Sequence, residues 1–180
     1  MKKFFISLLG ILMLFTAGCD KIDNNPTKKV EELMSKYQML DEEVLDDLNK
    51  TVDEEDLTDE QKERYKKLLK NQYKDLKYTI QDEKIDGDNA TVETEIEVTD
   101  YTKVIQESED YLNEHEDEFN DDKGNFSKTK YTDYKLEKME KTNTKVKYTL
   151  ELTLTKTDDE WEVDNLTETE RQKIHGIYNY

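Results

Sequence analysis

The sequence predicts an α+β fold in which N-terminal helices pack on an antiparallel sheet of about four strands. Apolar residues recur every three or four positions over residues 30–40 and 65–76, which is the period of an amphipathic helix. They alternate at every second position over residues 90–98 and 146–154, as in strands with one buried face. Since the helical segments surround two hairpin patterns, we expect an antiparallel sheet with its helices on one face.

The N-terminal part predicts three helical segments. The first begins with Thr27 as its N-cap and carries the apolar stripe over residues 30–40. A second, short segment is expected over residues 44–48, and an acidic connection follows it. The third begins at Thr58 and Gln61, whose Thr-x-x-Gln spacing is that of a capping box.

Two β-hairpins are predicted from the alternating segments. Their strands are expected over residues 78–85 and 90–98, and over residues 146–154 and 161–163. The sequence DGDN joins the first pair, and Gly87 can adopt the positive φ that a tight turn requires. The acidic sequence TDDE joins the second pair.

The remaining segments predict further helices. The helical period returns over residues 102–119. Residues 127–141 fit a helix or a strand, and their Lys/Glu-rich composition favours a helix. A closing helix is expected after a second capping box, formed by Thr167 and Glu170, with Gly176 as its C-cap.

The N-terminal 19 residues, MKKFFISLLGILMLFTAGC, have the features of an export signal. Lys2 and Lys3 precede an apolar run over residues 4–15, and small residues lead to Cys19, the only cysteine of the chain. The run is shorter than the roughly 20 apolar residues that a membrane span needs. The segment is therefore predicted to direct export and not to remain as a transmembrane helix.

An export signal that ends in Gly18-Cys19 resembles the lipobox of bacterial lipoproteins, with Thr16 where that family usually carries leucine. The resemblance implies that the Cys19 thiol is diacylglycerated and anchors the protein to the extracytoplasmic face of the cell membrane. An ordinary secretory signal with an incidental cysteine is the alternative. The expected organisation is a removed signal peptide over residues 1–18, a lipidated tether over residues 19–25 and a single α+β domain over residues 26–180.

Composition and charge narrow the classes of partner. Charged residues make up 40% of the chain, and its net charge is −18. The first 18 residues contain two lysines and no acid, so residues 19–180 carry −20. No basic cluster is present, which excludes nucleic acid as a partner. An anionic bilayer would repel the domain, so a lipid on Cys19 would have to supply the membrane affinity.

The order of helices, hairpin, helices and hairpin, with the ending TLELTLTKTDDEWEVDNL, looks like the nuclear transport factor 2-like (cystatin-like) fold. The hairpin over residues 85–98 and the strand that turns into Trp161-Glu162-Val163 carry this resemblance. It covers most of residues 26–180. It implies a curved sheet whose concave face, under the N-terminal helices, forms a pocket.

Three aromatic residues are candidates to line such a pocket: Tyr78, Tyr148 and Trp161. Tyrosines on inward strand faces are also ordinary core residues. His115 lies in an acidic helical sequence, and His175 lies at a helix C-terminus, where the helix dipole favours a charged imidazole. Capping or surface roles are expected for both histidines. We expect no catalytic, cofactor-binding or metal site, because no nucleophile triad, glycine-rich phosphate loop, zinc spacing or calcium loop is present.

The sequence thus favours a non-enzymatic lipoprotein that binds an envelope protein or a small ligand. It leaves open the identity of the partner, the oligomeric state, and whether the host has one membrane or two. One alternative is a pocket enzyme on the same scaffold, which predicts a buried carboxyl group beside a tyrosine with a raised pKa. Another is a cation-binding surface protein that uses acidic runs such as residues 53–56.

Overall fold

The structure is a computed structural model that describes residues 24–179. Cys19, the expected signal peptide and most of the expected tether lie outside these residues. The elements follow in the order α1 (Pro26–Met39), α2 (Glu42–Asp53), α3 (Asp59–Asp75), β1 (Lys77–Asp86), β2 (Asn89–Thr99), α4 (Tyr101–Glu114), the 3₁₀ turn η1 (Glu116–Phe119), α5 (Lys128–Lys141), β3 (Lys145–Thr157), β4 (Glu160–Val163) and α6 (Glu168–His175).

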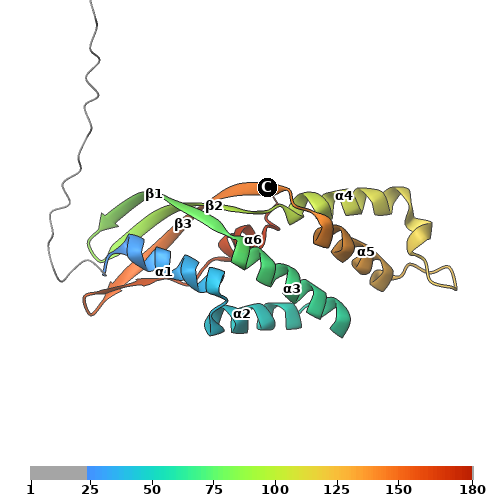
Figure 1. The fold of residues 1–180 in the computed structure, drawn as a ribbon, viewed down its shortest axis with the longest axis horizontal. Coiled ribbons are helices and arrows are strands. Elements are labelled where there is room, and N and C mark those ends of the chain that lie inside the picture. Colours follow the sequence, from blue (N-terminus) through green and yellow to red (C-terminus); the bar gives the residue numbers. More distant parts are fainter. Residues whose placement is uncertain (1–23, 180) are drawn as a thin grey trace, which may run out of the picture.

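The four strands form one sheet in the order β1-β2-β3-β4, and each neighbouring pair is antiparallel (Figure 1). Ile96 of β2 lies in register with Tyr78 on one side and with Tyr148 on the other. A β-bulge interrupts β1 between Ile80 and Asp82. The predicted α+β class with a four-stranded antiparallel sheet is confirmed.

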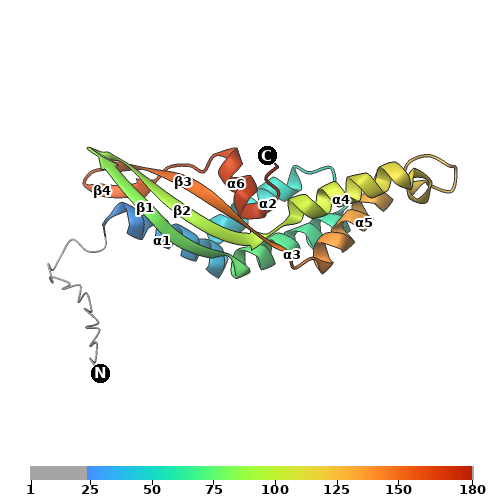
Figure 2. The same cartoon turned by 90° about the horizontal axis from the view of Figure 1, so that it is seen from above.

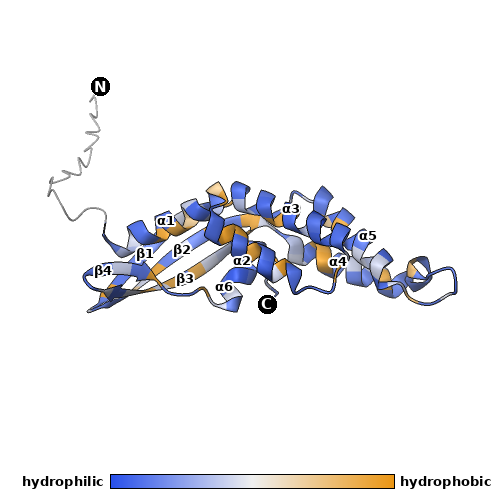
Figure 3. Cartoon of the chain, turned by 90° about the horizontal axis from the view of Figure 1, so that it is seen from below, coloured by the Kyte–Doolittle hydropathy of each residue, from blue (hydrophilic) through white to orange (hydrophobic). Residues whose placement is uncertain are grey.

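Helices cover one face of this sheet. α1, α3 and α6 contact the strands, and α2 packs on α3 on the side away from the sheet (Figures 1 and 2). Apolar surfaces of helices and strands face each other in Figure 3. The covered face of the sheet contributes Ala90, Val92, Ile96, Val98, Leu150, Leu152 and Leu154 to the core. The alternate positions, such as Glu93, Glu95 and Lys147, lie on the other face, which no element of the described chain covers.

α4 and α5 form a helical hairpin that extends beyond the sheet. It lies at the end of the molecule opposite the start of α1 and the β3–β4 turn (Figures 1 and 2). A second, smaller core holds this hairpin on α3, and its buried members are Leu68, Tyr101, Val104, Leu136 and Met139. Tyr65 of α3 packs against both cores. α3 therefore joins the two ends of the molecule.

Several predicted caps and turns are present. Both capping boxes form, at Thr58 and at Thr167. Residues 128–141 are helical with Ser127 as the N-cap, which resolves the ambiguity of this segment in favour of the helix. In the β3–β4 turn, Asp158 and Asp159 both have positive φ, as a two-residue type I′ hairpin turn requires.

The predicted N-cap of the first helix is wrong. Asn25 is the cap, and its Oδ1 accepts the Lys28 N–H at 2.8 Å. The reason is that Pro26 occupies the first helical position, for which its fixed φ is suited, so the cap falls on the residue before it. Thr27 instead donates from its N–H and its hydroxyl to Glu83 of β1, at 2.9 Å and 2.7 Å.

Two predicted boundaries also differ. The acidic connection after α2 begins later than expected, because Val52 continues the buried stripe of that helix and is fully buried. The helix predicted over residues 102–119 ends at Glu114, and a separate 3₁₀ turn carries Phe119 into an aromatic cluster with Tyr111, Tyr131 and Tyr134. The sequence between them is rich in acids, whose repulsion at i,i+4 spacing destabilises a continuous helix.

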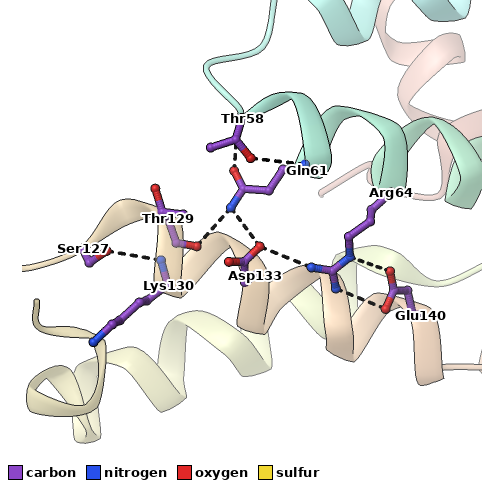
Figure 4. A network of polar contacts seen from close by, with 8 residues as sticks. All are labelled: Thr58, Gln61, Arg64, Ser127, Thr129, Lys130, Asp133 and Glu140. Atoms are coloured by element: carbon purple, nitrogen blue, oxygen red, sulfur yellow. Dashed lines mark hydrogen bonds and ion pairs between the residues drawn. The ribbon is translucent and has the colours of Figure 1, made fainter.

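A polar network attaches α5 to α3 (Figure 4). Gln61, which is part of the α3 capping box, also donates from Nε2 to the Thr129 carbonyl at 3.1 Å and to Asp133 at 2.9 Å. Arg64 binds Glu140 through two nitrogens, at 2.9 Å and 3.1 Å, and reaches Asp133 at 3.2 Å. Because a planar guanidinium fixes geometry when it binds a carboxylate through two bonds, this network restricts how the two helices can move relative to each other.

Candidate functional site: a groove between α1, α2 and β4

A groove of about 430 Å³ lies between α1, α2 and the segment that runs from β4 into α6. Its apolar lining consists of Leu33, Tyr37, Val44, Trp161, Val163 and Leu166. Charged side chains from all of these elements surround the apolar lining. Its volume is in the range of small-ligand sites, but nine of its fifteen lining residues are charged or polar, so it is more polar than such sites usually are.

Local sequence places the α1 side of the groove. Lys29, Leu33, Lys36 and Tyr37 are three or four residues apart and therefore share one face of the helix. Tyr37 is the innermost of them and is only 8% exposed.

Side-chain bonds hold the walls of the groove together. At one end, Asn24 donates to the Asp159 carbonyl at 2.5 Å and accepts the Trp161 N–H at 2.9 Å. These bonds fix the start of α1 on the β3–β4 hairpin. At the α2 end, Lys36 forms an ion pair with Glu43 at 2.6 Å and joins α1 to α2.

A row of buried aromatic rings lies behind the groove. The Tyr37 ring meets the Tyr73 ring edge-on, with centroids 5.0 Å apart, and the Tyr73 hydroxyl is hydrogen-bonded to His175 Nε2 at 2.7 Å. Burial raises the pKa of Tyr37 to about 12 and also raises the pKa of Tyr73. Burial lowers the pKa of His175 to about 4. All three groups are therefore uncharged at neutral pH.

The expectation of a surface or capping role for His175 is wrong. It is the last residue of α6, but it is buried beside Ile174 and bonded to Tyr73. The helix dipole favours a charged imidazole at this position, but burial disfavours it and lowers the pKa of His175. His115, in contrast, is the exposed C-cap of α4, as its sequence context predicts. Its ring stacks on Tyr111, with ring centroids 4.2 Å apart.

The three candidate pocket residues lie in two places. Trp161 lines the groove. Tyr78 and Tyr148 flank Ile96 on neighbouring strands, where Tyr78 packs half-buried against the main core and Tyr148 is buried in it. The Tyr148 hydroxyl donates to the Tyr178 carbonyl at 3.3 Å. Trp161 pairs with β3 at Lys156, eight residues beyond Tyr148, so the strand register separates it from the two tyrosines.

Three residues of the groove carry no functional signal in the sequence. Tyr37 is predicted only as part of an apolar helical stripe, and no motif marks Asp47 or Arg171. Asp47 lies on α2 and Arg171 on α6, more than 100 residues apart. Their charges both act on the Tyr37 hydroxyl, Asp47 raising its pKa and Arg171 lowering it. No short-range pattern in the sequence joins such distant positions.

Within residues 24–179, no carboxyl group is buried, and no group of three or more histidine, cysteine or acidic side chains is placed to hold a metal ion.

In the acidic loop before α5, Asp121 binds backbone groups of its own loop. Its carboxylate accepts N–H bonds from Lys123 and Asn125, at 2.8 Å and 2.9 Å, and these bonds lower its pKa. The described part of the chain also contains no helix with the length and apolarity needed to cross a membrane.

The fold and the groove define the class of this protein as an α+β protein with an open groove of mixed polarity at one edge of its sheet. Comparison with protein-family models, curated proteins and solved structures found no match for the chain. Its function is therefore inferred from the groove and from the N-terminal sequence.

Proposed function

We propose that the protein is a bacterial lipoprotein, held at the extracytoplasmic face of the cell membrane by a lipid on Cys19, and that it binds a small ligand or a partner protein without catalysing a reaction. The observation that carries the binding role is the groove of about 430 Å³ between α1, α2 and β4. Its size is that of a ligand site, and its apolar patch is surrounded by charged groups that can orient a polar ligand.

The length of the tether supports a position of the groove close to the membrane. Five peptide units separate Cys19 from Asn24, and they span at most about 18 Å when fully extended. Asn24 is bonded to the Trp161 backbone at one end of the groove. A lipid on Cys19 would therefore keep this end of the groove within a short distance of the bilayer, and the α4–α5 hairpin lies at the other end of the molecule (Figure 2).

We also propose that the fold is nuclear transport factor 2-like. The support is the element order, with three helices before the first hairpin and the second hairpin near the C-terminus, together with the packing of α1, α3 and α6 on a single sheet face. In this fold, the observed groove is the one formed where α1 and α2 meet the β4 edge of the sheet.

The anchoring role is tested by the substitution Cys19→Ser in the full chain. The thiol of Cys19 is the atom to be acylated, and a serine hydroxyl does not replace it. Cells grown with an alkyne-labelled fatty acid should therefore label the wild-type protein and leave the Cys19→Ser variant unlabelled. The control is Thr16→Leu, which restores the residue usual at that lipobox position and should keep the label. An unlabelled wild-type protein, or a labelled Cys19→Ser variant, would contradict lipidation at this position.

The binding role is tested by native mass spectrometry of the protein released gently from membranes of its own host. We expect a reproducible additional mass, non-covalently bound, that dissociates at higher collision energy. Substitution of Trp161 by alanine removes a large apolar part of the groove lining and should abolish that mass. A wild-type protein that carries only its covalent lipid, with no ligand and no co-purified protein, would contradict the binding role.

A further inference from the structure

The charges around the groove differ in how far they are already paired. Lys36 is paired with Glu43 at 2.6 Å, and Lys29 with Glu32 at 3.6 Å. Asp47, in contrast, forms no hydrogen bond or ion pair with any residue of the described chain, although it lines the groove and is exposed to it.

The third cation of the groove is also paired. Arg171 binds Glu168 at 3.3 Å and the Leu166 carbonyl at 2.5 Å. Glu162, like Asp47, lines the groove without a hydrogen-bonding or ionic side-chain partner among residues 24–179. The charges that remain available to a ligand are therefore negative.

A second, independent observation comes from Tyr37. Its side chain is more than nine-tenths buried and lines the groove, yet its hydroxyl has no hydrogen-bond partner in the described part of the chain. Its raised pKa keeps the phenol protonated, so the oxygen remains an acceptor and the O–H a donor at neutral pH. The Tyr37 hydroxyl oxygen is not fully buried, so it is open to the groove and can bond to a ligand there. Asp47 and Tyr37 line the same groove, and of the two charges that act on this hydroxyl, Asp47 and Arg171, only the Asp47 carboxylate has no ionic partner in the described chain.

We propose that the groove binds an organic amine, with the ammonium group at the Asp47 carboxylate and the Tyr37 hydroxyl oxygen, and with an apolar body against Leu33, Val44 and Trp161. This inference rests on the proposed binding function and adds the chemical class of the ligand. The net charge of −18 supports the same class, because the field of the whole chain attracts cations and repels anions.

The test uses n-hexylamine and hexanoate, two probes of equal chain length and opposite charge, with the full-length protein in detergent micelles. Trp161 is the only tryptophan of the chain and lines the groove, so its fluorescence reports occupancy directly. We expect hexylamine to change this fluorescence in a saturable way and hexanoate to bind at least about tenfold more weakly, since it meets unpaired carboxylates.

Two variants locate the ammonium group, and one serves as the matched control. Asp47→Asn should weaken hexylamine binding about fivefold or more, as expected for the loss of one charge-assisted hydrogen bond. Tyr37→Phe removes only the hydroxyl and should weaken it about threefold to fivefold. Asp46→Asn removes the same charge from the neighbouring position of α2, which does not line the groove, and should leave binding within about twofold. Thermal unfolding of each variant, followed by circular dichroism, shows whether the fold is retained.

Three outcomes overturn the inference, and they differ in what they mean for the proposed function. If hexanoate binds as tightly as hexylamine or more tightly, the amine class is wrong and the groove remains a ligand site. If Asp46→Asn weakens binding as much as Asp47→Asn, the effect comes from net charge and not from the proposed position of the ammonium. If neither probe changes Trp161 fluorescence and native mass spectrometry shows no ligand, both the amine and the use of this groove are contradicted.

Discussion

Substitution of Gly176 by alanine is expected to destabilise the protein by about 3–4 kcal/mol. Gly176 has φ +72°, a conformation that an alanine adopts only with strain. In addition, a Cβ at this position would overlap the Thr99 carbonyl oxygen and approach Gln72 Nε2 to 2.6 Å. For a chain of this length, the loss corresponds to a fall in melting temperature of about 10 °C, measured by circular dichroism or calorimetry.

The cause of this sensitivity is the close packing of three backbone segments around Gly176. Its carbonyl accepts the N–H groups of Tyr101 and Thr102 at the start of α4, at 2.9 Å and 3.0 Å. The Gln72 side chain binds both backbone groups of Thr99, at 2.9 Å and 3.1 Å. A methyl group on Gly176 therefore displaces the end of β2 together with the start of α4.

Gly124→Ala is the matched control for this substitution. Gly124 also has a positive φ, of +80°, but no atom lies within 4 Å of the Cβ that alanine would add. Alanine there should destabilise the protein by only about 1–2 kcal/mol, the effect of the backbone conformation alone. Equal destabilisation by the two substitutions would show that the contact between Gly176 and Thr99 is not what limits the packing.

The second large expected effect is a loss of stability on mild acidification, caused by His175. Its pKa is about 4 in the folded state, against 6.5 for an exposed histidine, because the ring is buried. Between these two values the unfolded chain binds a proton that the folded chain does not. Stability from this group is therefore complete above about pH 6.5 and falls as the pH decreases towards 4. The total loss is about 3 kcal/mol.

Chemical denaturation at intervals between pH 7.5 and pH 4.5 measures this effect. His175→Gln keeps a hydrogen-bonding group for Tyr73 but does not titrate, so its stability should be nearly independent of pH in this range. His115→Gln, at the exposed C-cap of α4, should retain the wild-type slope. The carboxylates whose pKa values are lowered, such as Glu140 beside Arg64, lose their contribution only at lower pH. A His175→Gln variant with the full wild-type slope would assign the acid sensitivity to other groups.

Local sequence was sufficient for most secondary structure, because its signals act over a few residues. The capping boxes at Thr58 and Thr167 and the alternation over residues 90–98 and 146–154 are confirmed. The exceptions are caused by single residues or short sequences that the apolar period does not take into account. Pro26 moved the first N-cap to Asn25, and the acidic sequence after Glu114 ended a helix that the apolar period alone continued.

The candidate groove was less accessible from the sequence. Trp161 lines it, whereas Tyr78 and Tyr148 lie elsewhere, because the pairing register of β3 with β2 and β4 decides which aromatic residues become neighbours. A period of two assigns a residue to a sheet face but does not say which helix covers it. Asp47 and Tyr37 line the same groove because a short turn at Leu40 and Asp41 leads from α1 into α2, with Lys36 bonded to Glu43.

The sequence by itself determined the α+β class, the antiparallel hairpins and the boundaries of most elements, since propensity, capping and periodicity depend on neighbours in the chain. The expected export signal and its Cys19 are also features of the sequence alone, and they lie outside the described residues. Only the tertiary structure decided that His175 is buried against Tyr73 and that a groove forms where α1, α2 and β4 meet. The physical reason is that burial and pKa depend on which distant segments pack together, and packing is a property of the whole chain.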